Sequence, residues 1–213
     1  MSMETAFVPP RVASLDDPLR LAVLISGGGS GLAALLKFQE TEPRCHRTVL
    51  VLADSEGAAG LEHGRQAGID SKGIPIPPGL EMSERRMAHE AMVEMQLQSS
   101  DTELVVLSGY MRILTPSFVG NWKGRIVNVH PSLLPDFPGV HAHRDVLSSG
   151  VSTTGCTVHL VDEGVDTGPI LAQREVPVLP EDNEEALQER VKEVEHVLYP
   201  EVIDMLCSGQ FSL

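Results

Sequence analysis

The chain has few cysteines, few aromatic residues and no long apolar run, and each scarcity excludes a class of protein. Its 213 residues include 4% aromatic residues and three cysteines, Cys45, Cys156 and Cys207. The cysteines are widely spaced, without a CxxC pair, which argues against a disulfide framework or a cysteine zinc site. We therefore expect a reducing, cytoplasmic environment, with neither a signal peptide nor a membrane span.

Positive charge is also scarce. The sequence has 16 Lys and Arg against 30 Asp and Glu, a formal net charge of -14. An acidic body repels nucleic acid and anionic membranes, so we expect neither as a partner. A phosphate ligand would need a local positive site. The expected partners are small molecules, and the pattern leaves monomer and homodimer open.

Apolar strands and helical segments alternate along the chain. Strands are expected at 21–26, 48–53, 73–76, 104–108 and 124–130, and helices at 32–39, 61–66 and 83–98. Continuous apolar strands separated by helices predict a mostly parallel sheet with helices on both faces. Apolar runs at 157–161 and 169–172, followed by a long helix from about residue 182, predict an antiparallel addition.

The fold class is therefore α/β, a three-layer Rossmann-like sheet flanked by helices, with a mixed or antiparallel C-terminal part. The length suits one domain with a sizeable core. Residues 1–18, with Pro9-Pro10 and several acids, are expected to form a flexible N-terminal extension, and 19–213 a single domain.

Two polar side chains end a strand that is otherwise apolar. Asn128 and His130 are two residues apart, so on a strand they point to the same face, at an edge where open α/β sheets bind ligands. An amide beside an imidazole can stabilise an oxyanion and move a proton. Asp166, in an acidic loop between two apolar runs, either pairs with His130 or only turns the loop.

A glycine cluster, Ser26-Gly27-Gly28-Gly29-Ser30-Gly31, follows the first strand and opens a helix. Its spacing matches neither the dinucleotide fingerprint nor a Walker A loop. Free backbone N–H groups at a helix N-terminus attract phosphate, and a plain tight turn is the alternative. We favour phosphate on a ligand that is not a dinucleotide.

The C-terminal helix carries a further polar set. Lys192 and Glu195, three residues apart, lie on one helical face and are able to meet a phosphate and an amine, although a solvated face also explains such charges. His141 and His143, two apart at an expected helix start, do not share a face, so we expect no metal site.

These stretches together resemble the phosphoribosylglycinamide formyltransferases, or GAR transformylases, a family of folate-dependent formyltransferases. The resemblance covers nearly all of residues 21–206. It is carried, in order, by residues 24–30, 108–114, 128–135, 137–143, 166–170 and 195–200. Any one match could be chance, but chance does not account for all of them in order.

The resemblance implies transfer of a formyl group from 10-formyltetrahydrofolate, as co-substrate, to the amine of N1-(5-phospho-D-ribosyl)glycinamide, a step of de novo purine (IMP) synthesis. It implies that Asn128, His130 and Asp166 are catalytic, and that no metal takes part. By the same resemblance, the part to about residue 120 binds phosphate, and the later part is catalytic and binds folate. The implied phosphate and ribosyl-glycinamide contacts are Gly29, Ser30, Gly31, Lys192 and Glu195. The implied folate contacts are Arg86, Met111, Arg112, Ile113, Leu114, Asn128, Asp162, Glu163, Gly164, Val165 and Asp166.

One departure concerns the phosphate loop, which in the family commonly ends in asparagine where this chain has Gly31. Glycine keeps the backbone N–H but lacks the amide side chain, so Gly31→Asn is expected to tighten phosphate binding.

Other readings remain. A methionyl-tRNA formyltransferase would be expected to carry a further basic domain. Formyltetrahydrofolate deformylase, which uses water as acceptor, is the runner-up, although it usually carries an N-terminal regulatory domain. A non-catalytic protein that binds phosphorylated ligands is the third alternative.

Overall fold

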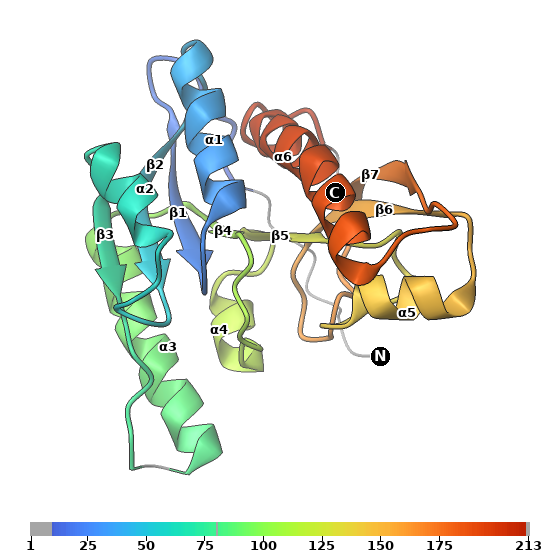
Figure 1. Cartoon of the computed structure of the whole chain (residues 1–213). Coiled ribbons are helices and arrows are strands. Elements are labelled where there is room, and N and C mark those ends of the chain that lie inside the picture. Colours follow the sequence, from blue (N-terminus) through green and yellow to red (C-terminus); the bar gives the residue numbers. More distant parts are fainter. Residues whose placement is uncertain (1–9, 80, 212–213) are drawn as a thin grey trace, which may run out of the picture.

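The computed structural model of the chain describes residues 10–79 and 81–211. Within these residues the chain forms seven strands and six helices (Figure 1). The strands are β1 (Leu19–Ile25), β2 (His46–Ala53), β3 (Asp70–Gly73), β4 (Leu104–Leu107), β5 (Ile126–His130), β6 (Thr153–Leu160) and β7 (Ile170–Pro177). The helices are α1 (Ser30–Thr41), α2 (Leu61–Gln66), α3 (Met82–Ser99), α4 (Pro116–Asn121), α5 (Ala142–Ser149) and α6 (Glu184–Cys207).

All seven strands belong to one sheet, in the order β3-β2-β1-β4-β5-β6-β7. The first five are parallel to one another, with Leu24 of β1 opposite Leu107 of β4, and Leu107 opposite Asn128 of β5. β6 and β7 continue the sheet in antiparallel pairing. The predicted α/β class, with its mostly parallel sheet and antiparallel C-terminal part, is thus confirmed.

The sheet has a buried core on each face, which explains why its strands are apolar without alternation. Leu21 and Val23 of β1 pack into a cluster with residues of α1, α2 and α6. Ala22 and Leu24, which point the other way, pack with residues of α3 and α4. α1 and α6 lie side by side on their face of the sheet (Figure 1).

A buried tyrosine anchors α6 to the centre of the sheet. The Tyr199 hydroxyl lies 2.9 Å from the carbonyl oxygen of Leu107 in β4 and 2.8 Å from that of Val127 in β5. Its O–H can donate to either carbonyl, and burial raises the pKa of the phenol well above its ordinary value. The hydroxyl therefore acts as a neutral donor that joins the helix to two adjacent strands.

We expect Tyr199→Phe to lower the free energy of unfolding by about 1–2 kcal/mol, because the ring still fills its site while the carbonyls lose their donor. Urea denaturation, followed by circular dichroism, measures this change. An unchanged free energy would show that the hydroxyl contributes nothing to the docking of α6.

The structure differs from the sequence predictions at two elements. The third strand covers Asp70–Gly73 rather than 73–76, because Pro75 has no N–H to continue the pairing beyond Ile74. The short helix α4 was not predicted. Its start follows from Thr115, whose hydroxyl accepts a hydrogen bond from the N–H of Phe118 at 3.3 Å, and from Pro116 at the first position.

The segment that precedes β1 makes contacts with the domain where the structure describes it. Residues 1–9 of the expected flexible extension lie outside the described residues. From residue 10 the chain is held to the domain: the Arg11 Nε donates to Glu103 at 2.7 Å, and the Ala13 N–H donates to the carbonyl of Cys207 at 2.9 Å. Arg11 and Ala13 are thus tied to the domain by hydrogen bonds.

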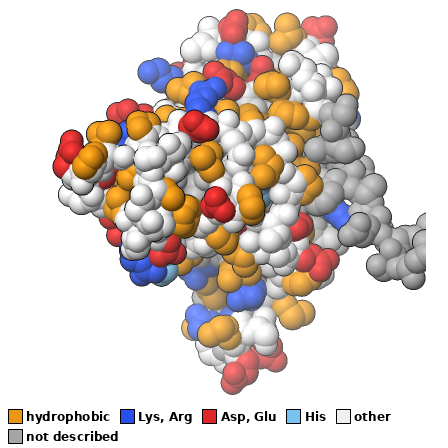
Figure 2. Space-filling view, turned by 90° about the vertical axis from the view of Figure 1, so that its right-hand side faces the viewer, with side chains coloured by type: hydrophobic (Ala, Val, Ile, Leu, Met, Phe, Trp, Pro, Cys, Tyr) orange, Lys and Arg blue, Asp and Glu red, His pale blue; other side chains and the backbone are white. Residues whose placement is uncertain are grey.

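The surface carries both signs of charge. On the face shown in Figure 2, Lys and Arg side chains are scattered among acidic and hydrophobic ones rather than gathered into one broad basic area. Among residues 10–79 and 81–211, no helix combines the length and the apolar character needed to cross a membrane.

Candidate active site

The structure brings together the predicted amide, imidazole and carboxylate at one edge of the sheet. β5 supplies Asn128 and His130, and the loop between β6 and β7 supplies Asp166. The His130 Nδ1 lies 3.3 Å from Asp166 Oδ2. Of the two readings that the sequence left open for Asp166, pairing with His130 is therefore the correct one.

His130 is held on both sides of its ring. Its Nε2 lies 2.9 Å from the carbonyl oxygen of Phe137, and its side chain is 6% exposed. A carbonyl only accepts, so Nε2 donates its N–H to it. With a carboxylate at Nδ1 as well, both ring nitrogens face oxygen acceptors. These two contacts fix the orientation of the ring.

Asp166 is fixed by its own backbone and by a neighbouring loop. Its φ of 55° places it in the left-handed region, which aspartate tolerates better than most residues. Its Oδ2 accepts a hydrogen bond from the N–H of Gly139 at 2.8 Å. The preceding turn is tied by Asp162, whose Oδ1 accepts from the N–H of Gly164 and the hydroxyl of Thr167. The carboxylate is thus preorganised toward His130.

A second histidine, His159, belongs to the cluster and was missed from the sequence. It lies opposite Asn128 in the pairing of β5 with β6. The Asn128 Nδ2 lies 3.2 Å from His159 Nε2, and Asp166 Oδ1 lies 3.7 Å from the same nitrogen. Burial lowers the pKa of His159, and its Nδ1 donates to the carbonyl of Leu160. A neutral His159 therefore accepts one N–H of the Asn128 amide and leaves the other free.

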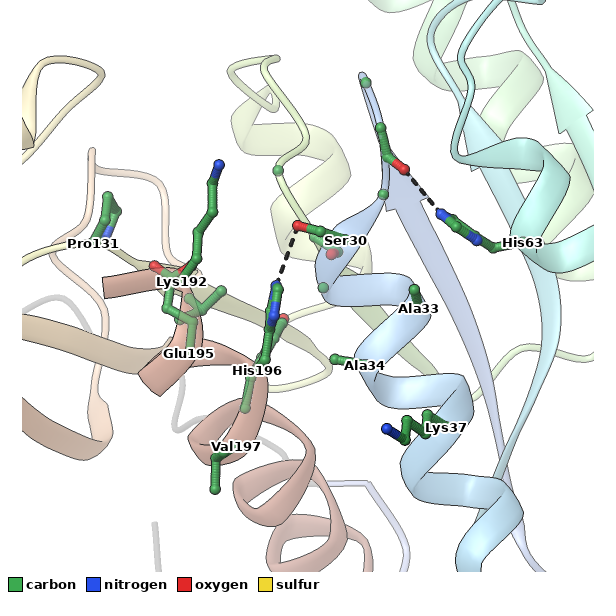
Figure 3. Close-up of a pocket in the computed structure, with 18 of the residues that line it drawn as sticks. Ser30, Ala33, Ala34, Lys37, His63, Pro131, Lys192, Glu195, His196 and Val197 are labelled. Atoms are coloured by element: carbon green, nitrogen blue, oxygen red, sulfur yellow. Dashed lines mark hydrogen bonds between the residues drawn. The ribbon is translucent and has the colours of Figure 1, made fainter. Parts of the chain in front are cut away.

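The glycine cluster forms the loop between β1 and α1. Gly29 has a φ of 68°, and a Cβ there would lie 2.9 Å from the Cα of Gly60, so only glycine fits. The Ser30 hydroxyl lies 3.2 Å from the Nε2 of His196 in α6 (Figure 3). On the other side, the Nε2 of His63 donates to the carbonyl of Gly28 at 3.2 Å (Figure 3). The loop is therefore held between α6 and α2.

A cavity of about 1200 Å³ opens beside this loop. Its walls come from both ends of the chain: the glycine loop and α1 on one side, and α6 on the other (Figure 3). Val129 and Pro131, the chain neighbours of His130, also line it. The cavity thus joins the glycine loop to the strand that carries Asn128 and His130.

Lys192 and Glu195 of α6, the two residues predicted to contact the acceptor, both line this cavity. Lys192 is already paired with a carboxylate, whereas Glu195 has a raised pKa. The Lys192 Nζ lies 2.6 Å from Glu189 Oε1, so a bound phosphate would compete with that carboxylate for the ammonium group. Burial raises the pKa of Glu195 to about 7, against the opposing effect of Lys192. A carboxyl group that titrates near neutrality is well placed to accept a proton from an amine.

The raised pKa of Glu195 predicts a pH-dependent stability. Between its ordinary pKa of 4.5 and about 7, this side chain ionises in the unfolded chain but stays protonated in the folded one. Its contribution to the free energy of unfolding is therefore fully present below 4.5 and is lost as pH rises through about 7. Relative to Glu195→Gln, which cannot ionise, the wild type is expected to lose stability over this interval.

Denaturant unfolding at several pH values from 4.5 to 8 measures this difference, with Glu193→Gln, a change at an exposed neighbour on α6, as control. A constant difference between wild type and Glu195→Gln at every pH would contradict a carboxyl that stays protonated in the folded protein up to a pH of about 7.

The residues that the resemblance implies for folate binding differ in their exposure and in whether they line the cavity. Met111 and Ile113 are exposed, at 68% and 64%, and Met111 lines the cavity. The Arg112 Nε donates to Asp54 Oδ2 at 2.5 Å, whereas Leu114 packs against the core on the α3 face. Arg86 lies on the exposed side of α3 and is not among the residues that line the cavity. Of the acidic loop, the exposed members are Glu163, Gly164 and Val165.

Within the described part of the chain, no three His, Cys, Asp or Glu side chains are grouped so as to hold a metal ion. The polar groups at this edge of the sheet are hydrogen-bonding side chains and the pair of His130 with Asp166. The fold and the cluster together define a class: a Rossmann-like enzyme with an amide, an imidazole and a carboxylate at the end of a parallel strand.

Comparisons with known proteins agree with this class of enzyme and show the family within it. The formyl transferase family model matches residues 19–203, and the chain belongs to this family. It is 38% identical to phosphoribosylglycinamide formyltransferase of Escherichia coli (strain K12) over 197 residues, which cover 92% of this chain and 90% of that protein. It is 42% identical to the trifunctional purine biosynthetic protein adenosine-3 of Drosophila melanogaster over 89% of this chain, which spans only 14% of that protein.

A solved structure, that of glycinamide ribonucleotide transformylase 1 from Symbiobacterium toebii, has a TM-score of 0.86 and 40% identity. The match covers 92% of this chain and 91% of that one. The likeness therefore extends over nearly the whole fold, including the antiparallel part.

Proposed function

We propose that the protein transfers the formyl group of 10-formyltetrahydrofolate to the amine of N1-(5-phospho-D-ribosyl)glycinamide, as in de novo purine synthesis. The observation that carries this proposal is the cluster of Asn128, His130 and Asp166 at the end of β5, where the neighbouring Val129 and Pro131 line the cavity that begins at the glycine loop. The names of the similar proteins support the same acceptor and the transfer of a formyl group.

In this reaction the amine of the acceptor attacks the formyl carbon and creates a tetrahedral oxyanion. We assign the free N–H of Asn128 as one donor to that oxygen. The Nε2–H of His130, which donates to the carbonyl of Phe137 in this structure, becomes the second donor when it turns to the substrate. Asp166 balances the positive charge of the ring and orients it. When the intermediate collapses, the bond between the formyl carbon and the folate nitrogen breaks, the acceptor amine gives up a proton and the folate nitrogen gains one.

The acceptor has a phosphate at one end and an amine at the other, and the cavity offers a group for each. The N–H groups of Gly29, Ser30 and Gly31 lie at the N-terminus of α1, where phosphate binds well. Lys192 supplies a cation, and Glu195 is our choice for the group that accepts the proton from the amine.

Folate belongs, in this proposal, against the exposed side chains of Met111 and Ile113 and the loop from Asp162 to Asp166. Apolar side chains near backbone donors and acceptors suit a flat heteroaromatic ring. Arg112 contributes through its backbone, because its guanidinium is paired with Asp54. Arg86 is proposed only for the glutamate tail of folate, where an exposed cation is sufficient. The protein is proposed to act in the cytoplasm on small molecules, without nucleic acid, membrane or metal.

The test is formation of tetrahydrofolate from 10-formyltetrahydrofolate by the purified protein, with and without glycinamide ribonucleotide. We expect turnover only with the ribonucleotide. Equal turnover without it would make the protein a hydrolase, and no turnover in either case would favour a binding protein.

A further inference from the structure

The hydroxyl of Ser108 belongs to a largely buried residue at the wall of the cavity and has no hydrogen-bond partner among the described residues. Ser108 follows β4, and its backbone N–H donates to the carbonyl of Leu24 at 2.9 Å. The residue is 8% exposed and lines the cavity. Within residues 10–79 and 81–211 its Oγ makes no hydrogen bond, so the hydroxyl is free to bind a ligand in the cavity.

Ser108 also occupies space that a side chain at position 31 would need. A Cβ on Gly31 would lie 2.5 Å from the Oγ of Ser108 but 3.8 Å from its Cβ. The conflict is therefore with the hydroxyl alone. A glycine at position 31 and a hydroxyl at position 108 are compatible, whereas a larger residue at 31 forces that hydroxyl to move.

The earlier expectation for Gly31→Asn must be corrected on this ground. Asparagine brings the same Cβ, so the single substitution displaces the Ser108 hydroxyl before its amide can help. We now expect weaker, not tighter, binding from that change.

We propose that the Ser108 hydroxyl binds the phosphorylated end of the acceptor substrate, and that Gly31 is the residue that leaves room for it. This rests on the proposed function for the identity of the substrate. Gly31 belongs to the loop at the start of α1 whose N–H groups we assign to the phosphate, and Ser108 lies against it. A hydroxyl donor to an anionic oxygen gives a charge-assisted hydrogen bond, which is stronger than a neutral one.

The first test is Ser108→Ala, with steady-state kinetics and with calorimetric titration of glycinamide ribonucleotide in the absence of folate. We expect Kd and KM for the ribonucleotide to rise about tenfold. KM for the folate and kcat are expected to stay near their wild-type values, which a merely structural role would not preserve. Ser100→Ala, a change at a half-buried serine just before β4, is the matched control.

The second test is a double-mutant cycle of Gly31→Ala and Ser108→Ala. Alanine at 31 displaces the hydroxyl, so we expect the double variant to bind about as well as Ser108→Ala alone rather than to show the product of the two losses. Unchanged affinity in Ser108→Ala would overturn the proposal, and multiplying losses would overturn the role of Gly31.

The proposed acceptor substrate can be wrong while the role of the Ser108 hydroxyl is right, and the two outcomes are distinguishable. If the wild type binds no ribonucleotide, the same variants are titrated with inorganic phosphate. Weaker phosphate binding in Ser108→Ala would then support the hydroxyl as a phosphate ligand without the proposed acceptor, and equal binding would overturn it.

Discussion

His130→Ala is expected to lower kcat by about 10³-fold with little change in KM for either substrate. In the proposed mechanism, the imidazole is the group of the cluster that both donates to the oxyanion and moves a proton. Alanine removes both actions but leaves the glycine loop and α6 untouched. Steady-state and single-turnover kinetics measure the loss, and the latter shows whether it lies in the chemical step.

His141→Ala, at an exposed residue just before α5, is the control, and we expect it to retain activity. Circular dichroism and the melting temperature must show that His130→Ala is folded, because its ring also bonds to the carbonyl of Phe137. A folded variant with near wild-type kcat would disprove the assigned mechanism.

The second large effect is expected from Asp166→Asn, which should lower kcat by about 10²-fold to 10³-fold. Asparagine suits the left-handed backbone at this position, and its oxygen can still accept from the N–H of Gly139. What it loses is the negative charge beside His130. The variant therefore separates charge from geometry better than alanine would.

Asp136→Asn, at an exposed aspartate of a nearby loop, is the matched control for the loss of one negative charge. If Asp166→Asn and Asp136→Asn had equal kcat values, the carboxylate of Asp166 would have no part in supporting the protonated ring.

Much of the fold was predictable because buried parallel strands must be apolar throughout. β1 and β4 show this directly, since both of their faces meet a core. β3 was misplaced because it is an edge strand of polar composition, Asp-Ser-Lys-Gly, whose pairing comes from its neighbour and not from a pattern of its own.

The site was predictable as far as local geometry reaches. Asn128 and His130 share a face because they are two residues apart on a strand. The contact of Asp166 with His130 depends on how the loop between β6 and β7 closes, which spacing does not determine. His159 was missed because its contact with Asn128 depends on the register of β6 against β5, which the sequence does not give. A histidine inside the apolar run 157–161 was the available signal.

The contact between Ser108 and Gly31 was not predictable either, because it also depends on how two strands lie beside each other. Each is ordinary in its own segment, and the conflict between a Cβ at one and the hydroxyl of the other appears only when β4 lies beside β1. A substitution that looks favourable in sequence, such as Gly31→Asn, is thereby reversed in its expected effect.

The last helix forms one wall of the cavity and the first loop forms the other. Ser30 and His196 meet across 166 residues of sequence, and Tyr199 fastens α6 to the middle of the sheet. Ligand affinity and the docking of α6 are therefore thermodynamically linked. A ligand that needs both walls is released whenever α6 detaches, and it stabilises the docked helix by RT ln(1 + [L]/Kd) as its concentration rises. A higher substrate concentration would thus lower the fraction of molecules in which α6 is detached from the sheet.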